Sequence, residues 1–221
     1  MTAPERLIVG ISGASGSIYG VRLLEVLRGR VETHLVMSKA AEMTLAYETD
    51  RTPAAVRALA DKAYAIGDVG GAIASGSFAT RGMVIAPCSV KTLAEIASGI
   101  TGSLLTRAAD VVLKERRKLV LVLRETPLHL GHIRNMLAVA EMGAIVAPPV
   151  PAFYAKPATL DDMVDHTIGR VLDLFGIDSD LVRRWGEARP AGDRAADAPA
   201  RTARRASDAP PRPARASRKA P

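Results

Sequence analysis

The chain of 221 residues is 48% hydrophobic and 24% charged, which is enough for one folded domain with a core of its own. Its net charge of +7 would indicate a nucleic-acid or membrane-surface partner only if the charge were spread over that domain. Residues 188–221, however, contain nine basic and three acidic residues, so the rest of the chain carries a net charge of only +1. No run of about 18 apolar residues, as a membrane-spanning helix requires, occurs in the sequence.

The composition of residues 188–221 differs from that of the rest. They include twelve alanines and six prolines and no Val, Ile, Leu, Met or aromatic residue, so their apolar surface is too small to offset the entropy lost on ordering. We expect a folded domain over residues 1–187 and a disordered Ala/Pro/Arg-rich tail over residues 188–221. Nucleic-acid binding through the tail is the alternative function that its charge suggests. Without aromatic side chains for stacking, such binding would be weak and nonspecific.

A single cysteine, Cys88, excludes an intramolecular disulfide and is typical of a reducing compartment. We expect it to be a small buried hydrophobic residue. The first residues include Pro4, Glu5 and Arg6, and the apolar run behind them, residues 7–11, is too short for the core of a secretion signal. The sequence therefore predicts a cytoplasmic protein without a membrane span.

Short β-rich runs alternate with longer helical patterns along the domain. Strands are expected over residues 7–11, 32–37, 83–86, 119–123 and 144–147, and helices over residues 17–27, 39–47, 90–97, 107–117, 133–142 and 160–175. The runs 7–9, 83–85 and 119–122 are continuously apolar, as strands buried on both faces of a parallel sheet are. The alternation predicts an α/β fold, a doubly wound, mostly parallel sheet of Rossmann or flavodoxin type with helices on both faces.

Ligands bind such sheets at the carboxyl ends of the strands. Small, hydroxyl-bearing and cationic residues follow four of the expected strands, at residues 12–16 (SGASG), 38–39 (SK), 87–92 (PCSVKT) and 124–127 (RETP). The glycine spacing differs from the dinucleotide fingerprint, but a glycine-rich turn that opens a helix still offers backbone N–H groups to a phosphate. Ser38 stands where an NAD-binding unit would have an acidic residue, which disfavours NAD and leaves FMN open.

Several of these residues also have a purely structural interpretation. Ser15 could cap the helix after the glycine turn, and Ser89 with Thr92 could cap the helix that follows them. Arg124 and Glu125 come directly after a buried strand. Charged side chains at such a place are unfavourable unless they pair with an opposite charge or bind a ligand. A structural ion pair between these two residues is the alternative to a functional role.

Two patterns resemble metal sites, and we interpret both differently. Asp161, Asp162 and Asp165 match the D-D-x-x-D pattern that holds magnesium on prenyl diphosphates. Thr159, however, is a good N-cap residue for this segment, so the acids are expected in the first turn of a helix, where the helix dipole favours them. Two histidines, at positions 129 and 132, lie three residues apart, but no further ligand has a convincing spacing. We expect no metal site.

Eight separate blocks of the sequence resemble the UbiX-type flavin prenyltransferases, a family within the superfamily of homo-oligomeric flavin-containing proteins that also includes cysteine decarboxylases. In chain order the blocks are residues 11–16 (ISGASG) with 19–20 (YG), 36–41 (VMSKAA), 48–50 (ETD), 74–78 (ASGSF), 87–93 (PCSVKTL), 107–117 (RAADVVLKERR), 124–128 (RETPL) and 151–154 (PAFY). The resemblance extends over about residues 6–185.

The resemblance implies transfer of the dimethylallyl group of dimethylallyl monophosphate to N5 and C6 of reduced FMN, without a metal. The product, prenylated FMN, would serve UbiD-type decarboxylases, including one in ubiquinone biosynthesis. It also implies a homododecamer built from trimers, with sites at subunit borders. The alternative within the superfamily is an FMN-dependent decarboxylase of aromatic acids or cysteine peptides. The cysteine decarboxylases carry Pro-Ala-Ser-Ala-Asn where this chain has residues 87–91 (PCSVK).

The resemblance also implies roles for individual residues. FMN would be bound by Gly13, Ala14, Ser15, Ser38, Ser89, Val90, Lys91, Thr92 and Arg124. The phosphate of the dimethylallyl donor would be held by Lys114, Tyr154 and Arg170. The implied catalytic residues are Ser15, Glu48, Glu125 and Arg124: Glu125 would protonate the leaving phosphate, and Glu48, assisted by Ser15, would take the proton from C6. Residues 69–73 are small and aliphatic where some relatives carry an aromatic residue beside the allyl group.

Overall fold

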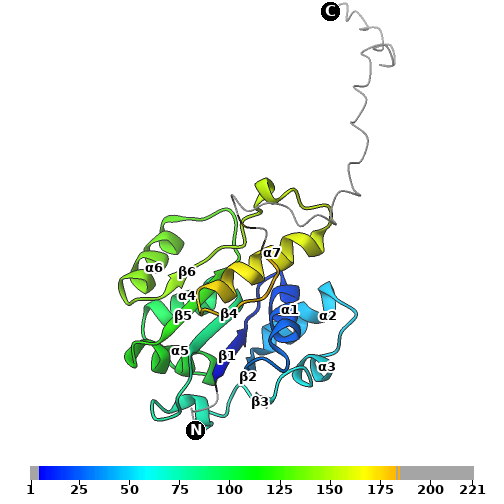
Figure 1. Ribbon diagram of the computed structural model, residues 1–221. Coiled ribbons are helices and arrows are strands. Elements are labelled where there is room, and N and C mark those ends of the chain that lie inside the picture. Colours follow the sequence, from blue (N-terminus) through cyan, green and yellow to red (C-terminus); the bar gives the residue numbers. More distant parts are fainter. Residues whose placement is uncertain (1–4, 183, 185–221) are drawn as a thin grey trace, which may run out of the picture. The chain divides into compact units, whose positions relative to one another are not determined.

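The computed structural model describes residues 5–182 and 184, so the predicted tail over residues 188–221 lies outside the described residues. Six strands form one sheet in the order β3-β2-β1-β4-β5-β6, and every neighbouring pair is parallel (Figure 1). The strands are β1 (Arg6–Ile11), β2 (Glu32–Met37), β3 (Lys62–Tyr64), β4 (Gly82–Cys88), β5 (Lys118–Leu123) and β6 (Ile145–Val146). The predicted fold class is confirmed.

Helices cover both faces of the sheet (Figure 1). One face carries α1 (Ser17–Leu27), α2 (Lys39–Glu48), α3 (Pro53–Arg57) and α7 (Leu160–Asp173). The other face carries α4 (Val90–Ala97), α5 (Leu104–Lys114) and α6 (Leu130–Glu141). Two short 3-10 turns, η1 (Ala72–Ala74) and η2 (Phe153–Ala155), lie in the connections. None of the described helices is long and apolar enough to cross a bilayer.

The strands are buried on both faces because alternate residues enter two separate cores. In β1, Leu7 and Val9 belong to the core that includes side chains of α1 and α7, whereas Ile8 belongs to the core on the opposite face, which includes side chains of α5. In β5, Val120 joins the first core and Leu121 the second. Since each of these side chains is at most 2% exposed, the continuously apolar runs in the sequence reflect burial on both sides of the sheet.

The structure differs from the sequence-based prediction mainly at element boundaries. The short elements α3 and β3 were not predicted, and the expected helix over 107–117 begins three residues earlier, at Leu104. A reciprocal cap explains the earlier start, because Thr106 N donates to Ser103 Oγ and Ser103 N to Thr106 Oγ1. The start of α6 is likewise earlier, since His129 caps it by accepting from Gly131 N at 3.0 Å.

The aspartate run begins α7, as its capping pattern predicts. Thr159 Oγ1 accepts from Asp162 N at 3.1 Å, and Asp162 Oδ2 accepts from Thr159 N at 2.9 Å. Asp165, one turn further on, pairs with Arg22 of α1 at 2.6 Å. These carboxylates therefore serve to start α7 and to bind it to α1.

We expect Gly20→Ala to destabilise the protein although alanine favours helices. Gly20 lies in α1 against β4, and a Cβ at this position would lie 2.3 Å from the Ala86 carbonyl oxygen and 2.7 Å from Ile11 Cδ1. Overpacking of this kind lowers the free energy of unfolding by about 1–3 kcal/mol. Urea denaturation of Gly20→Ala measures the loss. Gly67→Ala is the control, because a Cβ at Gly67 meets no heavy atom within 4 Å, and an equal effect of both substitutions would contradict the packing argument.

Candidate active site

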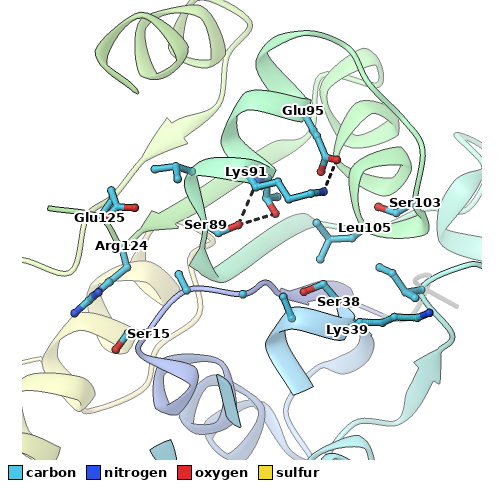
Figure 2. A pocket seen from close by; sticks show the side chains of 16 residues that line it. Ser15, Ser38, Lys39, Ser89, Lys91, Glu95, Ser103, Leu105, Arg124 and Glu125 are labelled. Carbon is cyan, nitrogen blue, oxygen red and sulfur yellow. Dashed lines mark hydrogen bonds and ion pairs between the residues drawn. The ribbon is translucent and has the colours of Figure 1, made fainter. Parts of the chain in front are cut away.

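A cavity of about 590 Å³ lies at the carboxyl ends of the central strands (Figure 2). This volume is in the range of small-molecule sites. The structure brings ten of the sequence-predicted residues together in its wall: Gly13, Ala14, Ser15, Ser38, Ser89, Val90, Lys91, Thr92, Arg124 and Glu125. They come from the segments that follow β1, β2, β4 and β5, so the parallel sheet brings together residues that are far apart in the sequence.

Three serines in the wall are N-cap residues. Ser38 Oγ accepts from Ala41 N at the start of α2, Ser89 Oγ from Thr92 N at the start of α4, and Ser103 caps α5. All three serines line the cavity, so three helices begin there. Because the amino end of a helix carries partial positive charge and N–H groups without intrahelical partners, this wall favours an anionic group such as a phosphate.

The start of α1 is capped by Glu48, and not by Ser15 as the purely structural interpretation of Ser15 would have it. Ser15 does not cap this helix; Glu48 Oε2 accepts from Gly16 N and from Ser17 N, each at 2.9 Å. Burial raises the pKa of Glu48, but hydrogen bonds from the Ser15 hydroxyl and from the backbone N–H groups of Ser17 and Gly16 outweigh it and lower the pKa. Glu48 is therefore ionised at neutral pH next to Ser15, which lines the cavity.

Arg124 and Glu125 do not form the structural ion pair that the sequence left open. Glu125 Oε1 accepts from the neighbouring Thr126 N at 2.9 Å. Among residues 5–182 and 184, no carboxylate lies within ion-pair distance of the Arg124 guanidinium. Burial raises the pKa of Tyr19, and the nearby charge of Arg124 opposes that rise. The Arg124 cation is thus placed to meet an anion that enters the cavity.

Cys88 is fully buried at the end of β4, as the sequence predicts. Burial raises the pKa of its thiol to about 12, so that on the order of one thiol in ten thousand is ionised at pH 8. We expect the native protein to resist iodoacetamide at this pH and to take up one label per chain in guanidinium chloride. Intact mass spectrometry distinguishes the two states, and rapid labelling of the native protein would contradict this account of Cys88.

Comparison with known proteins decides the family. The family model for Flavoprotein matches residues 1–172. Flavin prenyltransferase UbiX from Escherichia coli (strain K12) is 61% identical over 185 residues, which cover 82% of this chain and 98% of that protein. The chain belongs to the UbiX flavin prenyltransferase family.

Solved structures of UbiX proteins agree with this assignment. The crystal structure of AnUbiX (PadA1) in complex with FMN and dimethylallyl pyrophosphate matches with a TM-score of 0.83 and 51% identity, over 85% of this chain and all of that chain. A dodecameric FMN-dependent UbiX-like decarboxylase from Escherichia coli O157:H7 matches with a TM-score of 0.81 and 53% identity, over 82% of this chain and all of that chain. The FMN-dependent cysteine decarboxylase SpaF, at 21% identity and a TM-score of 0.54, shares the fold alone.

One residue that the UbiX resemblance assigns to the donor phosphate lies far from the cavity of its own chain. Lys114 is the last residue of α5, whose first turn reaches the cavity through Ser103 and Leu105. A helix of this length places Lys114 about 15 Å further along the axis, towards the amino ends of the strands. There it pairs with Glu115.

The other two residues assigned to the donor phosphate also lie outside the cavity wall of their own chain. Tyr154 lies in η2 with its hydroxyl 3.3 Å from Nε2 of His166 on α7. Arg170, one turn beyond His166, pairs with Asp173 at 2.7 Å. Both residues therefore belong to the α7 face of the sheet, opposite the face that carries α5.

Six further residues line the cavity wall, and the sequence assigned a ligand-binding role to none of them: Lys39, Ala40, Ile66, Glu95, Ser103 and Leu105. Lys39 follows Ser38 at a strand end, and Glu95 lies one turn after Lys91, with which it pairs at 2.5 Å. For these two residues the sequence does contain a signal: Lys39 is a cation directly after a strand, and Lys91 and Glu95 are four residues apart on one helix. Ile66 and Leu105 are apolar residues, and their sequence does not distinguish a cavity wall from a core.

Proposed function

We propose that this cavity binds reduced FMN and that the protein joins a dimethylallyl group to N5 and C6 of the flavin. The observation that carries the proposal is the convergence of three capped helix starts and the Arg124 cation on one cavity, in a UbiX family member. The helix starts and the N-cap serines would hold the phosphate and hydroxyl groups of FMN. The related AnUbiX structure, which contains FMN and dimethylallyl pyrophosphate, supports this choice of ligands.

The residues of this chain would assist the departure of the donor's phosphate. Bound reduced FMN supplies the nucleophile at N5, and the leaving phosphate carries the developing negative charge. Arg124 would neutralise part of that charge, and Glu125, which shares the cavity wall, would supply a proton. For the second bond, the double bond of the dimethylallyl group would take up a proton from the protonated phosphate that has left, and C6 would bond to the carbon left electron-deficient. Glu48, ionised beside Ser15, would accept the proton that C6 releases.

The positions of Lys114, Tyr154 and Arg170 lead us to propose that the site is completed by other copies of the chain. In one chain, Lys114 lies on the opposite face of the sheet from the other two residues. A homododecamer with sites at subunit borders would bring such residues together, and the related E. coli O157:H7 structure is dodecameric.

We expect two inactive variants, Lys114→Ala and Arg124→Ala, to restore activity when they are co-assembled. If the two residues reach one site from different chains, a mixed oligomer contains some sites with both residues intact. Flavin prenylation by the variants, alone and after joint refolding or co-expression, tests this arrangement. Mixed oligomers that remain as inactive as either variant alone would place both residues in the same chain's site.

The identity of the donor is tested by the product that it releases. The family resemblance favours dimethylallyl monophosphate, whereas the AnUbiX crystal contains the pyrophosphate. Under anaerobic conditions with reduced FMN, we expect release of inorganic phosphate from the monophosphate. Release of pyrophosphate from the diphosphate donor, with no reaction of the monophosphate, would overturn this choice of donor.

Direct decarboxylation is the second candidate, because the related E. coli O157:H7 structure is described as a decarboxylase. Release of CO₂ from an aromatic acid by this protein alone would favour it. We propose instead that a separate UbiD-type decarboxylase uses the prenylated FMN.

We also propose that the reaction takes place in the cytoplasm. The single cysteine, which is buried and forms no disulfide, agrees with a reducing compartment.

A further inference from the structure

The hydroxyl of Ser12 lies behind the cavity wall and joins two of the segments that line it. Ser12 follows β1 directly and is completely buried. Its Oγ donates to the Pro87 carbonyl oxygen at 3.0 Å and accepts from the backbone N–H of Ser89 at 2.7 Å. Both hydrogen-bonding functions of this hydroxyl are therefore used, and they link the turn after β1 to the segment after β4.

This link belongs to a row of hydrogen bonds that ties the strand ends together beneath the cavity. Ser38 N donates to the Ile11 carbonyl oxygen between β2 and β1, and Arg124 N to the Cys88 carbonyl oxygen between β5 and β4, each at 3.0 Å. Between β1 and β4 the strand pairing stops earlier. There Ser12 supplies the connection with its side chain as well as with its own N–H.

The position of Ser89 depends on this connection. Its backbone N–H donates to Ser12 Oγ, while its own hydroxyl accepts from Thr92 N at 3.2 Å and donates to Thr92 Oγ1 at 3.1 Å. Without the Ser12 hydroxyl, the N–H of Ser89 would be buried and unpaired, which is unfavourable enough to shift the segment. Ser89 and Thr92 both line the cavity, so such a shift would change the shape of the wall.

We propose that Ser12 is a positioning residue for FMN. Its hydroxyl fixes the glycine turn at residues 13–15 relative to the helix start at residues 89–92. The inference rests on the proposed function, because these two segments are the proposed FMN-binding segments. A side chain here must donate and accept within a space closed to water, and among small residues serine and threonine can do both.

The dissociation constant for FMN, measured by quenching of flavin fluorescence, tests this role in Ser12→Ala and Ser12→Thr. Thr33→Val is the matched control. Thr33 is 1% exposed, and its hydroxyl also donates and accepts, to Asp61 Oδ2 at 2.9 Å and from Asp61 N at 3.0 Å. It lies near the amino end of β2, away from the cavity.

We expect Ser12→Ala to bind FMN about tenfold more weakly, and Ser12→Thr within about twofold of the unsubstituted protein. Thr33→Val should lower the midpoint of thermal unfolding without changing FMN affinity. Undiminished affinity in Ser12→Ala, an equal loss in Thr33→Val, or failure of threonine to restore affinity would each overturn the proposal. If Ser12→Ala does not fold, Ser12→Cys, with its weaker donor and acceptor, replaces it in the same comparison.

A negative result for Ser12 can be told apart from a negative result for prenyl transfer, because the two are read from different measurements. The unsubstituted protein is assayed in the same preparation for FMN binding and for phosphate release from the dimethylallyl donor. FMN binding without phosphate release would contradict prenyl transfer and leave the Ser12 comparison intact, because that comparison is read from FMN affinity alone.

Discussion

Replacing Arg124 by alanine is expected to reduce the rate of flavin prenylation by about 10²–10³-fold, because a preorganised charge at a developing anion contributes on this scale. The guanidinium lines the cavity, and no carboxylate in the described part of the chain neutralises it. Its backbone N–H already holds the end of β5 against β4 by donating to Cys88, and alanine keeps that bond. The loss should therefore appear in turnover and FMN binding more than in stability.

Two further variants test whether the effect of Arg124→Ala comes from the loss of a positive charge at this position. Arg124→Lys keeps a positive charge and should recover part of the rate, although a lysine offers a point charge in place of a planar fork of donors. Arg28→Ala removes an exposed arginine at the end of α1 and should leave the rate unchanged. An Arg124→Ala protein that prenylates FMN within threefold of the unsubstituted rate would remove Arg124 from the reaction.

Glu48→Gln is expected to lower the rate of product formation by about 10²–10⁴-fold, the usual contribution of a general base. The glutamine oxygen can still accept the N–H groups of Gly16 and Ser17, so the start of α1 should remain capped. The amide cannot take up a proton, so closure of the ring at C6 should be slowed. Chromatography of the flavin products under anaerobic conditions follows the loss.

The pH dependence of stability provides an independent check on Glu48. Since the folded-state pKa of Glu48 is lowered, its carboxylate stabilises the fold above the ordinary pKa of glutamate, and this contribution is lost as the pH falls through the lowered value. As the pH is lowered, the midpoint of thermal unfolding should therefore fall less in Glu48→Gln than in the unsubstituted protein. Glu42→Gln on the same helix, where Glu42 pairs with Arg57, should leave prenylation unchanged; an equal loss of prenylation in both variants would contradict the role of Glu48.

Much of the fold could be predicted because its signals are local. The runs around Val9, Val84 and Val120 are apolar without alternation, which indicates strands buried on both faces, and the sheet confirms it. Boundaries were predicted less well, because they depend on caps. A threonine completes the reciprocal cap with Ser103, and a histidine at position 129 begins α6. The three-residue strand β3 is too short to show a period.

The sequence predicted those site residues that directly follow a strand, but not the contacts made by residues from other parts of the chain. Ser38, Ser89 and Arg124 follow strands directly, so the parallel sheet fixes their common location. The cap of α1 could not be predicted, because Glu48 reaches Gly16 from the end of another helix. A link across the chain such as that of Ser12 to Ser89 likewise leaves no signal in residue spacing.

The most direct test of the proposed reaction is the mass of the flavin after anaerobic incubation of reduced FMN, dimethylallyl monophosphate and the purified protein. We expect a flavin heavier than reduced FMN by one dimethylallyl group in place of one hydrogen, formed only when all three components are present. A flavin whose mass stays that of reduced FMN while the protein binds both small molecules would contradict the proposed prenyl transfer.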